Sequence, residues 1–166
     1  MRLTLQEILH IPGAIKPFQF SLDLSALDFF GSKPLAQPIQ VAGQVKNQAG
    51  VLTLTGEANT TLSLFCDRCL RPIETPLCIP ASFLLAEHLE NAENDEILLL
   101  ENGALDLDDL FTTVVVLGMD SKHLCSEDCK GLCPKCGANL NTESCTCKPD
   151  LDPRFAALAQ LLDIDE

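Results

Sequence analysis

Eight of the nine cysteines in this 166-residue chain fall into four close pairs, and no other feature of the sequence restricts the fold as strongly. Two thiols a few residues apart can occupy two corners of a tetrahedral metal site, so that two pairs complete one site. The chain is therefore expected to carry metal-binding loops, one near its middle and others toward its end. The pairs are Cys66/Cys69, Cys125/Cys129, Cys133/Cys136 and Cys145/Cys147.

The third pair lies in the clearest knuckle, the stretch "CPKCG" at 133–137. Two thiolates separated by two residues can bind one Zn²⁺ at about 2.3 Å each. The proline fixes its φ angle without removing a needed donor, and the glycine can take the positive φ that closes such a turn. The fourth pair follows after eight intervening residues. Together the third and fourth pairs make a geometrically reasonable zinc site.

The partner of the first pair stays open at this point. Cys66 and Cys69 stand at the end of a predicted strand, and such a knuckle usually joins another across space. Joining the second pair would give a second zinc site, whereas joining the third pair would give one ribbon-like site that ties a sheet to the tail. His123, two residues before Cys125, is an alternative ligand.

The N-terminal sequence predicts a cellular compartment in which cysteine thiols stay reduced. It has no basic segment followed by an unbroken apolar run and no small-residue cleavage site, so we expect a cytoplasmic protein. That compartment and the odd cysteine count disfavour disulfides. Redox C-x-x-C motifs need an exposed, low-pKa thiol at a helix N-terminus, whereas these motifs are expected in loops. Zn²⁺ is thus the expected cofactor. The unpaired Cys78, in the apolar stretch "PLCIP", is expected to be a small core residue.

Apolar and polar residues alternate along much of the first 119 residues, which is typical of half-buried strands. Thr, Val and Leu at a period of two favour an antiparallel sheet with one solvated face. A short helix is expected within 3–10, a loop at 26–37, and a Pro-interrupted edge strand at 73–88. The other predicted strands are 16–24, 38–47, 51–58, 60–66 and 97–103.

A helix is expected near 105–117, with Asp106 as its N-cap and two further carboxylates in its first turn. Residues 120–150 are expected to form a cysteine-rich loop. A second helix is expected over 152–165, where a proline occupies the first helical position. The predicted fold is α+β, with a β-rich body over 1–119 and a zinc-binding tail with a terminal helix over 120–166.

The charge distribution is strongly asymmetric. The formal net charge is −13, and residues 86–110 hold nine acidic side chains and no Lys or Arg. This acidity disfavours a simple electrostatic nucleic-acid binder. No apolar run approaches the roughly 18 residues of a membrane span, so no membrane partner is expected. The cations beside the knuckles are candidate phosphate contacts or counter-charges for thiolates: Arg68, Arg71, Lys130, Lys135 and Lys148.

The motifs resemble those of the YceD family of bacterial and plastid proteins. The resemblance rests on "CDRCLRP" in the middle, "CSEDCKGLCPKCGANLN" and "CTC" in the tail, and the closing "DPRFAALAQLL". It implies a role in the accumulation of large-subunit ribosomal RNA, through 23S rRNA processing or stability and assembly of the large subunit. It implies no catalytic activity, and the sequence contains no G-x-S-x-G, P-loop or H-E-x-x-H motif.

The expected function is therefore that of a non-enzymatic ribosome biogenesis factor. Its partner would be pre-23S rRNA, touched through a local basic patch, or a basic ribosomal or processing protein that binds the acidic stretch 87–109. One alternative is a cytosolic thiol oxidoreductase or redox-switched chaperone that uses the C-x-x-C pairs. Another is a nuclease subunit with acidic metal ligands from 87–109. Nothing in the sequence sets the oligomeric state.

Overall fold

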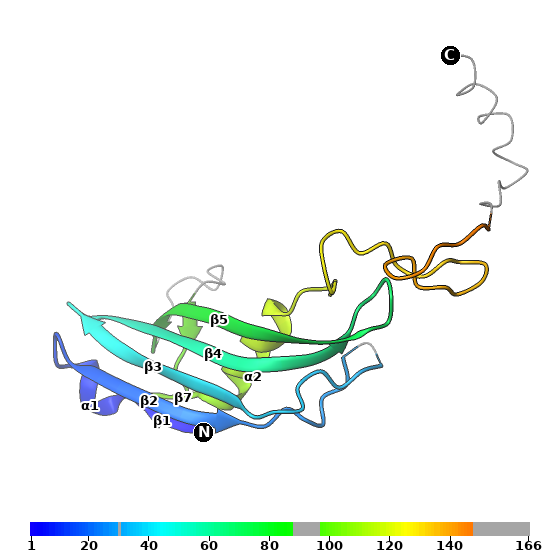
Figure 1. Ribbon diagram of the computed structural model, residues 1–166. Helices are drawn as coiled ribbons and strands as arrows, with labels where there is room; N and C mark the ends of the chain where they lie inside the picture. Colours follow the sequence, from blue (N-terminus) through cyan, green and yellow to red (C-terminus); the bar gives the residue numbers. More distant parts are fainter. Residues whose placement is uncertain (30, 88–96, 148–166) are drawn as a thin grey trace, which may run out of the picture.

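The computed structural model describes residues 1–29, 31–87 and 97–147, and it has the expected α+β architecture. A five-stranded sheet is covered on one face by a helix and a two-stranded sheet, and the cysteine-rich segment extends from one end (Figure 1). The predicted helix over 152–165 lies outside the described residues. The elements are β1 (Arg2–Thr4), α1 (Gln6–Leu9), β2 (Ile15–Leu22), β3 (Ile39–Gln48), β4 (Val51–Phe65), β5 (Pro72–Ala86), β6 (Ile97–Leu99), β7 (Ala104–Asp106) and α2 (Leu107–Gly118).

The larger sheet has the strand order β2-β3-β4-β5-β6. Its first four strands are antiparallel, as the alternation predicts, whereas β6 runs parallel to β5. The edge position of β5 is confirmed over most of its length, because β6 pairs only with Leu84–Ala86. The prediction of separate strands at 51–58 and 60–66 is wrong. Both belong to β4, because the alternation continues through the small inward residues Gly56 and Ala58.

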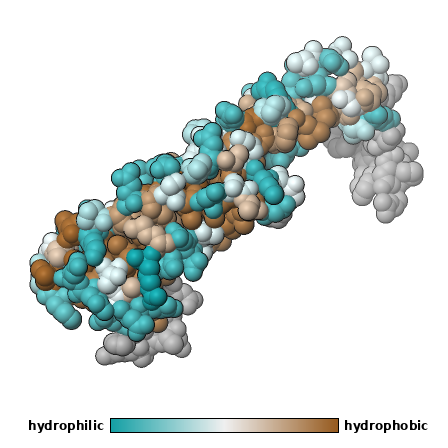
Figure 2. Space-filling model, turned by 90° about the horizontal axis from the view of Figure 1, so that it is seen from below, coloured by the Kyte–Doolittle hydropathy of each residue, from teal (hydrophilic) through white to brown (hydrophobic). Residues whose placement is uncertain are grey.

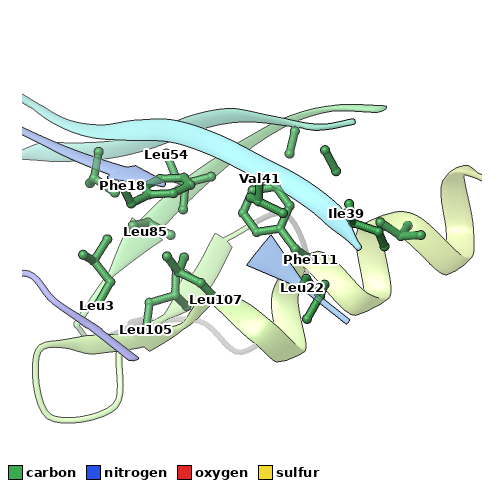
Figure 3. Packing of buried hydrophobic residues seen from close by; sticks show 14 of the residues in the cluster. Leu3, Phe18, Leu22, Ile39, Val41, Leu54, Leu85, Leu105, Leu107 and Phe111 are labelled. Carbon is green, nitrogen blue, oxygen red and sulfur yellow. The ribbon is translucent and has the colours of Figure 1, made fainter. Parts of the chain in front are cut away.

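The core lies between the inner face of the sheet and the layer formed by α2, β1 and β7 (Figure 3). Phe111 of α2 is fully buried beneath the sheet. Its ring centroid lies 5.9 Å from that of Phe18 and 6.0 Å from that of Phe20, in tilted and edge-on arrangements that aromatic pairs prefer. This contact fixes α2 across the sheet, and it thereby fixes the point from which the chain leaves toward the cysteines.

The helix predicted near 105–117 is confirmed as α2. The Asp106 side chain accepts a hydrogen bond from the Asp108 backbone N–H, which is the predicted N-cap. The pairing of β1 with β7 was not expected, since three-residue strands leave almost no periodic signal. The helix predicted within 3–10 is reduced to the four residues of α1. The side-chain amide of Asn47, which is buried in β3, donates to the carbonyl groups of Ile8 and Leu9 at the C-terminal end of α1.

The outer face of the sheet is solvated, and Cys78 lies on it. This residue is exposed, so its predicted place in the core is wrong. The inward positions of β5 are occupied by its neighbours Leu77 and Ile79, and strict alternation turns the residue between them outward. Among the described residues, no helix is both long enough and apolar enough to cross a membrane.

Candidate metal centres

The first four-cysteine group joins the end of the sheet to the segment that follows α2. The Sγ atoms of Cys66, Cys69, Cys125 and Cys129 all lie within 4.8 Å of one another. The sulfurs of Cys66 and Cys129 are 3.8 Å apart, and those of Cys69 and Cys125 are 3.6 Å apart. Thiolates held at about 2.3 Å by one tetrahedral Zn²⁺ would be separated by about 3.8 Å. The arrangement therefore fits a four-thiolate metal site, and three of its four cysteines are buried.

The knuckle of this group is the connection between the two longest strands, β4 and β5. Cys66 follows the last residue of β4, and its backbone N–H donates to the Arg71 carbonyl at 2.8 Å. The Leu70 N–H returns to the Cys66 carbonyl at 2.9 Å. Leu70 takes a φ of 57°, a left-handed conformation that is uncommon for a leucine. The rigid hairpin thus presents both thiols on one side of a tight turn.

Reciprocal hydrogen bonds dock the tail on this knuckle. The Asp67 N–H donates to the His123 carbonyl at 2.9 Å, and the His123 N–H donates to the Asp67 carboxylate at 2.6 Å. The Arg68 guanidinium donates to the Cys129 carbonyl at 2.7 Å, and the Leu132 N–H donates to the Arg68 carbonyl at 3.0 Å. These hydrogen bonds add to the sulfur contacts in placing the two halves of the site against each other.

The second group is formed entirely within the tail. The sulfurs of Cys133, Cys136, Cys145 and Cys147 also lie within 4.8 Å of one another. The Cys145 sulfur lies 3.3 Å from that of Cys133 and 3.7 Å from that of Cys136. Gly137 has a φ of 73° and donates its N–H to the Cys133 carbonyl, as expected for the turn that closes the knuckle. Cys136 and Cys147 are exposed, so this group is more open than the first.

Backbone donors favour a thiolate at one cysteine of each group. Burial opposes ionisation of Cys66, but N–H groups of Cys125, Cys69 and Arg68 outweigh it and lower the pKa of Cys66 to about 6. N–H groups of the 135–136 backbone lower the pKa of Cys133 to about 6. Each group therefore holds at least one anionic sulfur at neutral pH, which is the form that binds metal.

Other thiols keep their protons until a metal arrives. Burial, together with hydrogen bonding to Cys129, raises the pKa of Cys125 to about 12. Hydrogen bonding with Cys145 and Cys136 raises the pKa of Cys147 to about 12. Several thiolates so close together repel one another, and this repulsion is removed either by protons or by a metal cation among them. The arrangement is suited to binding a divalent metal ion with release of protons.

Metal affinity is accordingly expected to rise with pH. At neutral pH, Cys125 and Cys147 still hold the protons that a metal must displace, so each adds about a tenfold gain in apparent affinity per pH unit. Cys66 and Cys133 are already ionised there and add little above about pH 6. Zinc competition against a chromophoric chelator between pH 6.5 and 8, corrected for protonation of the chelator, measures the slope. A flat profile would contradict this ionisation pattern.

The structure thus brings the first cysteine pair to the second and the third to the fourth, which was one of the two arrangements left open by spacing. His123 belongs to neither group and contributes its backbone instead. The candidate RNA contacts Arg68, Arg71, Lys130 and Lys135 are exposed, and the Arg68 guanidinium also donates to the Cys129 carbonyl. Among the described residues, no set containing carboxylates forms a comparable metal-binding group.

Comparison with known families agrees with the cysteine pattern. The model of a family described as "Large ribosomal RNA subunit accumulation protein YceD" matches residues 54–162. The chain belongs to the YceD family. The matched region begins within β4 and includes both four-cysteine groups. The resemblance carried by the cysteine motifs is therefore confirmed.

Individual relatives support the same assignment. The chain is 34% identical over 155 residues to a maize protein named large ribosomal RNA subunit accumulation protein YCED homolog 1, chloroplastic; the match covers 74% of this chain and 53% of the maize protein. The Arabidopsis thaliana homologue is 26% identical, with 77% and 50% covered. The chain therefore spans about half the length of these two relatives. The uncharacterized YlbN of Bacillus subtilis is 24% identical, with 100% of this chain and 99% of YlbN covered. No solved structure matches the chain.

Proposed function

We propose that this chain is a non-enzymatic factor that promotes accumulation of 23S rRNA during assembly of the large ribosomal subunit. Membership of a family named for large ribosomal RNA subunit accumulation is the observation that carries the proposal. The chloroplast relatives from maize and Arabidopsis thaliana are also named for accumulation of the large ribosomal RNA subunit. The chemistry of the candidate sites agrees with it, because four-thiolate zinc sites leave no open position for substrate and usually serve to hold a fold.

Each four-cysteine group binds one Zn²⁺ in this proposal. Cysteine-only ligand sets in a tetrahedral arrangement favour zinc over the hard cations magnesium and calcium. Zinc would neutralise the repulsion among the thiolates and stabilise the knuckles. The eight ligands are Cys66, Cys69, Cys125, Cys129, Cys133, Cys136, Cys145 and Cys147.

The direct test removes the gene in the host organism. Loss of the chain is expected to lower 23S rRNA relative to 16S rRNA, and expression of the intact chain is expected to restore it. Crosslinking in the same cells separates pre-23S rRNA from a ribosomal protein as the contact. Normal rRNA levels in the deletion strain would refute the proposed function. Stoichiometric zinc in protein purified without added metal would separate it from the thiol oxidoreductase alternative.

RNA contact, if direct, is assigned to the cations at the metal-binding end. Because the Arg68 guanidinium is engaged with the Cys129 carbonyl, Arg71 and Lys130 are the better test positions, with Lys135 beside the second knuckle. The double charge reversal, Arg71→Glu with Lys130→Glu, is expected to weaken the association of the chain with pre-23S rRNA without loss of metal. Few cations are available, so the salt dependence should be shallow, at roughly one unit of log slope per phosphate neutralised.

A matched pair of reversals controls for total charge. Lys33→Glu with Lys46→Glu makes the same change outside the metal-binding segment and is expected to leave association nearly unchanged. Crosslinking yield in cells and zinc content of the purified variants provide the two measurements. If the two pairs weaken association equally, no local patch exists. If neither does so, the contact is made by a protein partner.

A further inference from the structure

A pocket of about 410 Å³ lies on the side of the body that carries α2, away from both cysteine groups. Seen from below, this side shows hydrophobic residues along the middle of the molecule with hydrophilic residues on either side (Figure 2). Such a volume is within the range of natural ligand pockets. Its wall comes from β1, β6, β7 and the outer face of α2: Arg2, Leu98, Leu99, Glu101, Ala104, Leu105, Asp106, Asp109, Leu110 and Thr113.

The pocket combines leucine side chains with carboxylates. Leu99, a large aliphatic residue at the end of β6, keeps 52% of its surface exposed. Leu98 and Leu110 are half-buried beside it. The Asp109 carboxylate makes no hydrogen bond or ion pair within the part of the chain that the structure describes. The pocket therefore offers unpaired negative charge next to apolar surface that solvent still reaches.

Arg2 shows which chemistry this wall accepts. Its guanidinium donates to the Glu101 carbonyl at 3.2 Å and lies 3.7 Å from the Glu101 carboxylate. Arg2, a cation of the chain itself, thus pairs with the Glu101 carboxylate, whereas the Asp109 carboxylate of the same pocket has no such partner among the described residues. Long basic side chains suit a leucine surface, because their alkyl stems lie on it while the charged head reaches a carboxylate.

Charge decides among the possible occupants. A second copy of the chain carries a net charge of −13, and its terminal segment 148–166 has five acidic and two basic residues, so both would meet like charge at Asp109. Phosphate groups of RNA would be repelled in the same way. We propose that the pocket binds a Lys- or Arg-rich segment of a basic protein partner. This inference rests on the proposed function, since it supplies the protein contact of a ribosome assembly factor.

The test uses the purified, zinc-loaded full chain and a fluorescein-labelled eight-residue peptide of alternating Arg and Leu. Fluorescence anisotropy at about 0.15 M salt screens distant charges beyond about 8 Å. The variant Asp109→Asn is expected to weaken binding about five- to tenfold, because it removes a charge-assisted hydrogen bond. Leu99→Ser removes apolar surface at an exposed position and is expected to weaken binding about threefold or more.

Two variants serve as controls for the pocket. Asp108→Asn makes the same change in the same helical turn, but Asp108 does not line the pocket and lies beside the Met1 ammonium. Glu57→Gln makes an equivalent change in charge on the outer face of the sheet. Both are expected to change the Kd by less than about twofold, and amide exchange confirms that every variant is folded.

Each outcome decides the inference. If all three carboxylate variants weaken binding equally, the peptide responds to total charge and the pocket proposal is overturned. Absence of measurable binding to the intact chain overturns it as well. The proposal is also overturned if a labelled single-stranded RNA oligonucleotide binds the chain and Asp109→Asn changes that binding. The proposed function is judged separately, by rRNA levels in the deletion strain, so the peptide result can fail while that function stands.

Discussion

If each four-cysteine group binds one Zn²⁺, as we propose, replacing Cys66 with Ser is expected to remove the metal of the first group and to release residues 120–132 from the end of the sheet. The first group is built from the β4–β5 connection and the tail, so it is the clamp between them. Structural zinc contributes about 10–16 kcal/mol of apparent binding free energy to such sites, which is far more than the backbone hydrogen bonds of the docked tail can supply. Without the fourth thiolate, those hydrogen bonds are expected to open frequently.

The corresponding change in the second group is expected to act locally. Cys133→Ser should loosen residues 133–147 and leave the first group loaded, because all four ligands of the second group come from that segment. Amide exchange and zinc stoichiometry measure both effects, and Cys78→Ser is the control because Cys78 is exposed and outside both groups. Loss of protection at 66–71 in Cys133→Ser would contradict two separate centres and favour one shared site.

The pairing of cysteines could not be predicted because it depends on distances that the sequence does not encode locally. Spacing identified the eight thiols that the two groups contain, but it left open whether Cys66 and Cys69 join the second pair or the third. The choice between the second and third pairs for Cys66 and Cys69 depends on where α2 ends relative to the end of β4. That distance is set by the contact of Phe111 with the inner face of the sheet.

Local patterns predicted the strands well, and their failures have local causes. The period of two correctly placed β2, β3 and β5, and the aspartate cap placed α2 within two residues. Cys78 was misplaced because the residue type was given more weight than its position between inward-facing Leu77 and Ile79. The pocket lined by β1, β6, β7 and α2 was not predicted, because β1 and β7 are too short to show in a hydrophobic pattern.

A second large effect is expected from Gly43→Ala in the middle of the sheet. Gly43 of β3 pairs directly with Gly56 of β4, and the ring of Phe18 lies over both. An added Cβ would stand 2.4 Å from the Thr55 carbonyl oxygen and 2.6 Å from the Phe18 ring. Neither the ladder nor the buried ring can move aside freely, so the expected loss is about 3 kcal/mol, near the upper end of overpacking effects. For a body of about 100 residues, this corresponds to a fall in Tm of roughly 12–24 °C.

Two further variants locate the cause of this loss. Gly56→Ala is expected to cost less, because its Cβ would lie 2.9 Å from the Ala42 carbonyl and 3.2 Å from the Phe18 ring. Adding Phe18→Leu to Gly43→Ala should recover only part of the loss, since the clash with the Thr55 carbonyl remains. Full recovery in the double variant would show that the backbone is not strained.

The same variant tests where the β-rich body ends and the tail begins, a boundary that we propose at residues 119 and 120. Thermal unfolding of Gly43→Ala, followed together with zinc release to a chromophoric chelator, is expected to give two events. Release from the first centre should shift with the sheet, because Cys66 and Cys69 belong to the β4–β5 connection. Release from the second centre should keep its wild-type temperature, because all four cysteines of the second group lie within residues 133–147 and none belongs to the sheet. A common shift of both events would mean that body and tail fold as one unit, and the proposed boundary would then have no physical meaning.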